Sequence, residues 1–121
     1  MAVYFVEKIA GDVLVLDIRG QITLGEETGA VREKVKQLVQ AGHTSVILDL
    51  AEVNYIDSAG LATLVWVYTS ARKQGGDVKL LRLTKRVRDL LQITRLSTVF
   101  EVYDTLDSAL RSFAAPPPPA P

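Results

Sequence analysis

Two buried-strand patterns on either side of a helical pattern constrain the fold more than any other feature of the chain. Residues 45–50 form a short, nearly continuous apolar run, which is typical of a strand covered on both faces of a sheet. A helical pattern begins near Ser58 and ends at Gly75-Gly76, and residues 78–83 again resemble a strand. The expected inward stripe of this helix consists of Leu61, Leu64, Val65 and Tyr68. Because the links are short, we expect a right-handed crossover between parallel strands.

The segments before this unit predict a hairpin and a further helix. Apolar residues 3–6 and 13–18 flank Gly11-Asp12, a combination that favours two antiparallel strands. From Glu26 the apolar period becomes helical, and Gly42 is a natural C-terminal stop for that helix. Its apolar stripe consists of Val31, Val35, Leu38 and Val39.

The segments after the crossover predict two short helices and a weak strand. Thr84 is expected to cap one helix, residues 99–103 to form the strand, and Asp104 to cap the last helix. The inward residues are Val87, Leu90 and Leu91 in the first helix and Leu106, Ala109, Leu110 and Phe113 in the second. The sequence therefore predicts a single-domain α/β fold over residues 1–113, with a mixed sheet of four to five strands packed with about four helices.

Composition limits the location of the protein and its partners. The 121 residues suit one domain, and residues 114–121, which are only Pro and Ala, predict an extended, disordered tail. The absence of cysteine excludes disulfides and thiolate metal sites. The 14 basic and 14 acidic residues balance, which gives no support for broad binding to nucleic acid or anionic membranes. Since neither a signal peptide nor a long apolar run is present, we expect a cytoplasmic protein.

Residues 53–61 are the candidate site, because they link the buried strand to the following helix, where sites in α/β sheets usually form. Asp57 or Ser58 is a good helix N-cap, so the Ser58 hydroxyl is expected near the positive end of the helix. A phosphate on Ser58 would be tolerated there and would turn a neutral surface acidic. Small Ala59 and Gly60 are expected to give this hydroxyl little steric cover. By itself, however, an Asp-Ser pair before a helix is more often only a cap.

Residues 48–61 resemble the signature of STAS domains. In that signature, a loop has the pattern Asp-Ser/Thr-x-Gly, where x is any residue. Asp57, Ser58 and Gly60 match this loop. The resemblance extends over residues 3–113 and includes Gly20-Gln21-Ile22, the Gly75-Gly76 break and the ending Phe100, Tyr103 and Ala109-Leu110.

The resemblance implies an anti-sigma factor antagonist. In that role the unphosphorylated protein binds an anti-sigma factor that is also an ATP-dependent serine kinase, and sigma factor is released. Phosphorylation, here of Ser58, separates the complex, and a PP2C-type phosphatase restores the hydroxyl. The chain would be a binder and substrate without catalytic residues, cofactor or metal. The implied partner-binding residues are Asp57, Ser58, Ala59, Gly60 and Thr23, where Thr23 occupies a position that is acidic in many antagonists.

Other interpretations remain open at this point. The chain could be a STAS scaffold, as in a stressosome-like assembly or an accessory subunit of a transport complex, or a sensor of a small ligand or nucleotide. A hydrolase is disfavoured, because the Gly-x-Ser-x-Gly motif is absent and His43 is the only histidine. Lys85, Arg86 and Arg88 are expected on a solvated face, and Trp66, with Tyr55 and Tyr68, is expected in the core.

Overall fold

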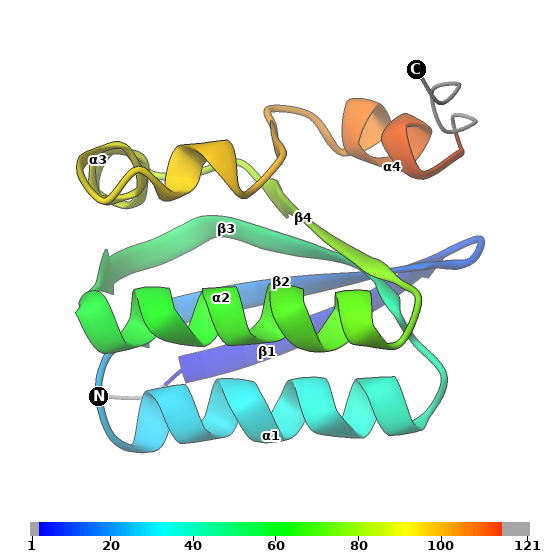
Figure 1. Cartoon of the computed structure of the whole chain (residues 1–121), viewed down its shortest axis with the longest axis horizontal. Coiled ribbons are helices and arrows are strands. Elements are labelled where there is room, and N and C mark those ends of the chain that lie inside the picture. The colour runs from blue at the N-terminus through cyan, green and yellow to red at the C-terminus, as the bar shows by residue number, and fades with distance from the viewer. Residues whose placement is uncertain (1–2, 115–121) are drawn as a thin grey trace.

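A computed structural model describes residues 3–114 and shows a mixed sheet in the order β1-β2-β3-β4-β5 (Figure 1). The strands are β1 (Val3–Ala10), β2 (Val13–Ile22), β3 (Ser45–Ile56), β4 (Asp77–Leu81) and β5 (Val102–Tyr103). The hairpin pair β1 and β2 is antiparallel, and all later pairs are parallel. Both the predicted hairpin and the predicted parallel crossover are therefore confirmed.

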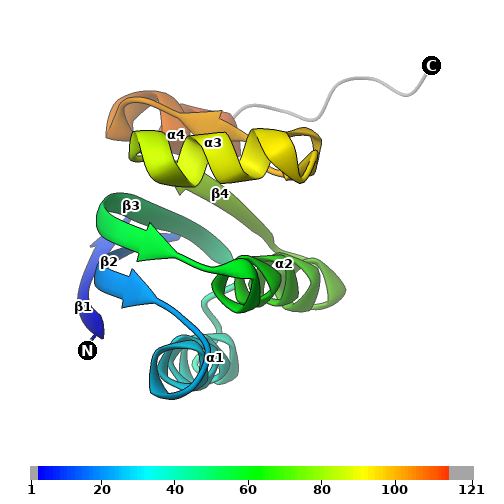
Figure 2. The same ribbon diagram turned by 90° about the vertical axis from the view of Figure 1, so that its left-hand side faces the viewer.

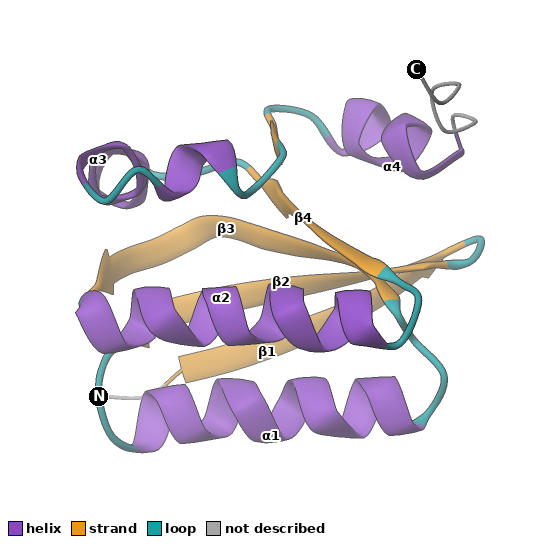
Figure 3. Cartoon of the chain, viewed as in Figure 1, coloured by secondary structure: helices purple, strands orange, loops and turns teal. Residues whose placement is uncertain are grey.

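Within residues 3–114, four α-helices cover the sheet in two groups. They are α1 (Glu26–Gln40), α2 (Ser58–Lys73), α3 (Lys85–Ile93) and α4 (Leu106–Ala114), with a short 3-10 turn at Leu96–Thr98 after α3. In Figure 3, α1 and α2 lie side by side below the strands, and α3 and α4 lie above them. The predicted α/β fold, with its mixed sheet and about four helices, is confirmed.

Strands β2 and β3 have apolar side chains on both of their faces. Leu14, Leu16 and Ile18 belong to the large core under α1 and α2, whereas Val13 and Val15 belong to a smaller core that includes Ala109 of α4. Since successive strand residues point to opposite faces, one apolar run supplies both cores. This arrangement confirms the prediction of a doubly covered strand at residues 45–50, which form the first half of β3.

Several predicted boundaries were wrong because pairing extends the strands beyond their apolar runs. β1 continues to Ala10 and β2 to Ile22. β3 continues to Ile56, which pairs with Ile22, so most of the predicted loop before Ser58 is strand. The last strand differs in the opposite direction: of the predicted residues 99–103, only Val102 and Tyr103 form β5.

The predicted caps and tail have mixed outcomes. Thr84 caps α3, as its Oγ1 accepts a hydrogen bond of 3.3 Å from the Val87 N–H. The cap of α4 is Thr105 rather than Asp104, because its hydroxyl accepts from the Ser108 N–H at 3.2 Å. Leu106 is exposed, so its predicted inward position was wrong.

Within α2, Val65 and Tyr68 are half-buried, and Val67 and Ala71 complete the buried stripe. Ala114 ends α4, and the rest of the predicted tail lies outside the described residues.

Candidate functional site

Asp57 is the single residue between β3 and α2, and it caps the helix. Its backbone is extended, and its Oδ1 accepts a hydrogen bond of 2.8 Å from the N–H of Gly60. Of the two caps that the sequence allowed, Asp57 is therefore the one used. Ser58 becomes the first residue of α2, at the end of the helix where the dipole is positive.

Asp57 also binds the loop between β2 and α1. Its second carboxylate oxygen, Oδ2, accepts a hydrogen bond of 3.0 Å from the N–H of Leu24. The Asp57 N–H donates to the carbonyl of Ile22 at 3.3 Å. The hydrogen bond from Leu24, followed by that from Gly60, lowers the pKa of Asp57 below its usual value. An ionised carboxylate thus joins the ends of two parallel strands beside Ser58.

Gly60 is buried in the first turn of α2 because that turn lies against the end of β2. A Cβ at this position would lie 2.0 Å from the carbonyl oxygen of Ile22 and 2.7 Å from Cγ1 of Ile56. The space that the absent Cβ of Gly60 leaves is thus occupied by the protein's own backbone and by Ile56. Gly60 supports the site by allowing α2 to approach the sheet.

The Ser58 side chain is exposed, and its hydroxyl forms no hydrogen bond within residues 3–114. The neighbouring Ala59 is half-buried, and its carbonyl accepts a hydrogen bond of 2.9 Å from the Thr63 hydroxyl. Figure 2 shows the start of α2 facing the viewer near the ends of β2 and β3. The hydroxyl is therefore free to act as an acceptor or donor for another molecule.

Thr23 begins the loop that Asp57 holds. Its hydroxyl donates to Oε1 of the buried Glu27 at 3.1 Å, and its carbonyl accepts from the Thr28 N–H at 3.3 Å. Between Thr23 and Gly25, the side chain of Leu24 is 78% exposed. Sequence reasoning missed Leu24, and its only signal was an apolar residue in an otherwise polar loop.

The other residues singled out in the sequence lie outside this site or have partners of their own. Arg86 stacks over Tyr55 at 4.3 Å, Lys85 pairs with Asp89 at 2.7 Å, and Arg88 lies 3.8 Å from Asp104. The basic run therefore has intramolecular partners. Trp66 is half-buried under Arg32 at 5.5 Å, and Tyr68 packs edge-on against Phe100. His43 is half-buried, and residues 3–114 contain no group of three or more potential metal ligands.

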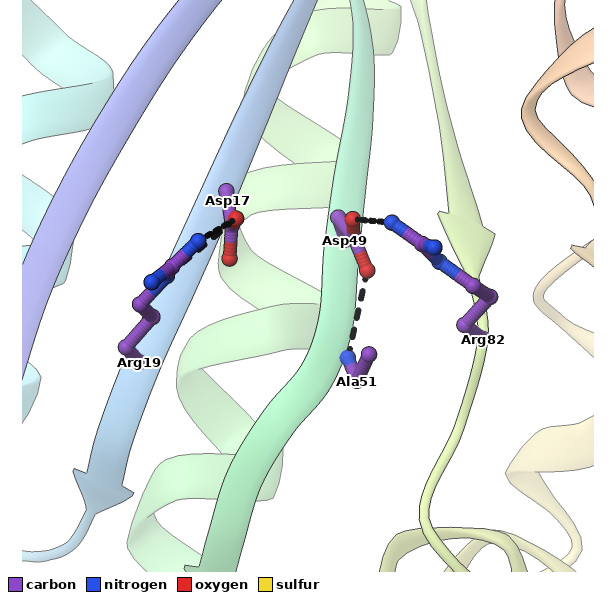
Figure 4. Close-up of polar contacts among 5 residues, drawn as sticks. All are labelled: Asp17, Arg19, Asp49, Ala51 and Arg82. Carbon is purple, nitrogen blue, oxygen red and sulfur yellow. Dashed lines mark hydrogen bonds and ion pairs between the residues drawn. The ribbon is translucent and has the colours of Figure 1, made fainter.

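A second polar cluster, also missed by sequence reasoning, lies on the sheet face opposite α1 and α2 (Figure 4). Asp17 and Asp49 are register partners on β2 and β3, and Ala51 donates its N–H to Asp49 at 3.2 Å. Arg19 pairs with Asp17 at 2.9 Å, and Arg82 pairs with Asp49. Asp17 Oδ1 is buried without a partner among the described residues. Because the two arginines largely offset these carboxylates, the cluster is an ion-pair group of the sheet.

Comparison with known proteins identifies the family. The STAS domain model matches residues 4–109. The anti-sigma-B factor antagonist of Bacillus subtilis is 32% identical over 87 residues, which cover 72% of this chain and 78% of that protein. The structure of an anti-sigma factor antagonist from Mycobacterium paratuberculosis superposes with a TM-score of 0.80 at 23% identity, covering 94% of this chain and 96% of that one.

The fold also matches a Bacillus protein whose structure was solved in a modified form. This is the cell fate determinant SpoIIAA in the phosphorylated form, with a TM-score of 0.70 at 17% identity over 91% of this chain and 99% of that one. Within residues 3–114, no helix has the length and apolarity needed to cross a bilayer. The family model covers most of the chain, and the chain therefore belongs to the STAS domain family.

Proposed function

We propose that this protein is an anti-sigma factor antagonist that acts as a phosphorylatable switch in the cytoplasm. In the unphosphorylated form it binds an anti-sigma factor kinase, and sigma factor is released. Phosphorylation of Ser58 ends the binding, and a PP2C-type phosphatase restores it. The observation that carries the proposal is the exposed, unbonded Ser58 hydroxyl at the start of α2, beside the ionised Asp57.

The local electrostatics suit a modification that changes the surface without unfolding the domain. A phosphate on Ser58 adds about −1.5 to −2 charges at neutral pH. The start of α2 favours an anion, so the helix tolerates the group. An approaching partner instead meets the phosphate and Asp57 together, because the Asp57 carboxylate is held next to it. The expected effect is a loss of affinity with little change in stability.

The proposed partner surface contains one large apolar side chain, Leu24, together with small and polar residues. Leu24, which is 78% exposed, would be buried by the partner, and its loop is held by Asp57. Ser58, Ala59 and Thr23 lie at the same end of the sheet. Gly60 is buried, so it contributes through the position of α2 rather than through direct contact.

The first test is site-mapped intact mass of the protein purified from its own cells. A species that is heavier by one phosphoryl group on Ser58, and that is absent in Ser58→Ala, supports the proposal. An unmodified protein under several growth conditions contradicts it. The candidate kinases are anti-sigma factors of the same organism, each assayed with ATP on the native protein and on Ser58→Ala.

Binding assays test the consequence of the charge. Ser58→Asp is expected to bind the anti-sigma factor at least tenfold more weakly than the native protein, whereas Ser58→Ala should keep the affinity. Ser97→Asp is the matched control, because Ser97 is an exposed serine in the turn after α3. Equal affinity of Ser58→Asp and Ser58→Ala for every candidate kinase would contradict the proposed switch.

A scaffold or accessory-subunit role is the second candidate. It is favoured by Thr23, which replaces an acidic residue of many antagonists and whose hydroxyl is bonded to Glu27. Size measurement in native extract separates the two roles. Residence in a large assembly, or stable co-purification with a transport ATPase, would favour this second role.

A further inference from the structure

Strand β1 presents a long unpaired edge. Its only neighbour among residues 3–114 is β2, so every second one of its eight residues directs its backbone N–H and C=O to the outer side, where no strand pairs with them. Figure 2 shows β1 at the outer edge of the sheet with no helix beyond it. Three of its apolar side chains are exposed: Tyr4 by 64%, Val6 by 39% and Ile9 by 65%. Such an edge is a template for pairing with another strand.

We propose that two copies of this chain pair antiparallel through their β1 edges and form one continuous sheet across the dimer. A two-fold axis perpendicular to the sheet relates antiparallel edges and keeps each sheet face on its own side. Residues that meet across the axis must therefore point to the same face. Val3 and Phe5 pack on the core under α1 and α2, so the odd-numbered residues of β1 share that face, and Tyr4, Val6 and Lys8 share the other.

One register satisfies this condition and also matches the side chains. With Val6 facing Val6 of the second copy, Tyr4 faces Lys8 and Val3 faces Ile9. These pairs bury the exposed apolar residues and place an ammonium group beside an aromatic ring. If the two-fold axis lay at Glu7 instead of Val6, Glu7 would face Glu7 of the second copy. Like charges directly opposite each other are destabilising. The opposite shift would bring Phe5 against Phe5 and would place Ile9 opposite no residue of β1 itself, which begins at Val3.

Other features of the chain favour a second copy as the occupant. The net charge is zero, so no long-range repulsion keeps copies apart. The edge has no proline and no glycine to block pairing. At the other side of the sheet, β5 has only two residues and offers no comparable edge.

Disulfide trapping tests the register directly, because the native chain has no cysteine. In Val6→Cys, the two sulfur-bearing residues would face each other with Cα atoms about 4.5–5.5 Å apart, which a disulfide can bridge. In the matched control Lys8→Cys, the two positions lie four residues out of register, about 13 Å apart. Mild oxidation should therefore give a covalent dimer with Val6→Cys and little with Lys8→Cys. Equal trapping of both variants would overturn the proposed register.

Light scattering after size exclusion tests the dimer itself. The native protein should change from the mass of one chain to that of two as its concentration rises. Val6→Lys should remain a monomer, since two lysines would meet at the axis, and a mixture of Val6→Lys with Val6→Glu should recover the dimer. Ile93→Lys, at a 79% exposed position on α3, is the control and should dimerise as the native protein does. A native protein that stays monomeric up to millimolar concentration would overturn the proposal.

Discussion

The carboxylate of Asp57 and the backbone N–H of Leu24 lie 3.0 Å apart, although 33 residues separate them in the chain. This hydrogen bond joins the loop after β2 to the start of α2. The same carboxylate caps the helix through Gly60. One side chain therefore connects the loop after β2 to the first turn of the helix that carries Ser58.

Replacing Asp57 should destabilise the fold. Asp57→Ala removes a helix cap and a second hydrogen bond, so the free energy of unfolding should fall by about 1–3 kcal/mol. Asp89→Ala is the control, because Asp89 forms only a surface pair with Lys85 and should cost about 0.5 kcal/mol or less. Urea denaturation of both variants measures the difference. Equal losses would show that the two hydrogen bonds of Asp57 contribute little.

The same carboxylate should make stability depend on pH. The pKa of Asp57 is lowered in the folded protein, so its contribution is fully present above the unfolded value, near 3.8, and is lost as the pH falls through the folded value. Asp57→Asn has no titratable group here. The native protein should therefore lose more stability than Asp57→Asn between about pH 6 and about pH 2.5, as measured by denaturation at each pH. Parallel pH profiles would contradict the lowered pKa.

Two glycines in helices should respond to alanine with opposite signs. Gly60→Ala forces a Cβ against the Ile22 carbonyl and should cost about 3 kcal/mol or more, because backbone cannot move aside cheaply. Gly29→Ala in α1 meets nothing within 4 Å and should stabilise by about 0.5–1 kcal/mol. Thermal unfolding of the two variants tests the pair. Stabilisation by Gly60→Ala would disprove the close approach of α2 to β2.

A negative charge at Ser58 should leave the fold intact. Since the start of α2 favours anions, Ser58→Asp should change the free energy of unfolding by less than about 1 kcal/mol. Comparison of its urea denaturation midpoint with that of Ser58→Ala measures this effect. A large loss of stability would mean that any binding defect of Ser58→Asp reflects unfolding rather than surface charge.

Arg82 combines an ion pair with an unusual backbone. Its φ is 53°, a region that favours glycine, and its guanidinium pairs with the buried Asp49. Arg82→Ala and Arg82→Gly both remove the pair, but only the glycine variant relieves the backbone. Arg82→Gly should therefore be the more stable of the two by about 1 kcal/mol in urea denaturation. The reverse order would contradict the left-handed conformation.

Local patterns were enough to predict most of the architecture. The doubly buried run at residues 45–50 and the glycine breaks after the helices set the element types and the parallel crossover. The end of β3 could not be predicted in this way. Glu52 and Asn54 interrupt its apolar pattern, and this part is a strand because β2 pairs with it through two irregular steps.

The candidate site could be predicted only in part, because some of its contacts depend on the register of β2 against β3. Asp57 as a cap follows from local chemistry, because a short carboxylate before a helix reaches the first N–H groups. The bond from Leu24 and the close contact of Gly60 with Ile22 depend on where β2 ends relative to β3. A pattern within one segment contains no information on that register. The partner-binding role of these residues stays a prediction.

The hydrogen bond between Asp57 and Leu24 distinguishes the folded chain from the unfolded chain. The two groups meet only after β2 and β3 have paired. The loop that holds Leu24 follows β2, whereas Asp57 follows β3, and the whole of α1 and β3 lies between them in the chain. A nascent or partly unfolded chain contains the same Ser58 but not the shaped surface around it. A partner that binds this surface, as proposed above, would therefore discriminate folded copies of the protein from unfolded ones.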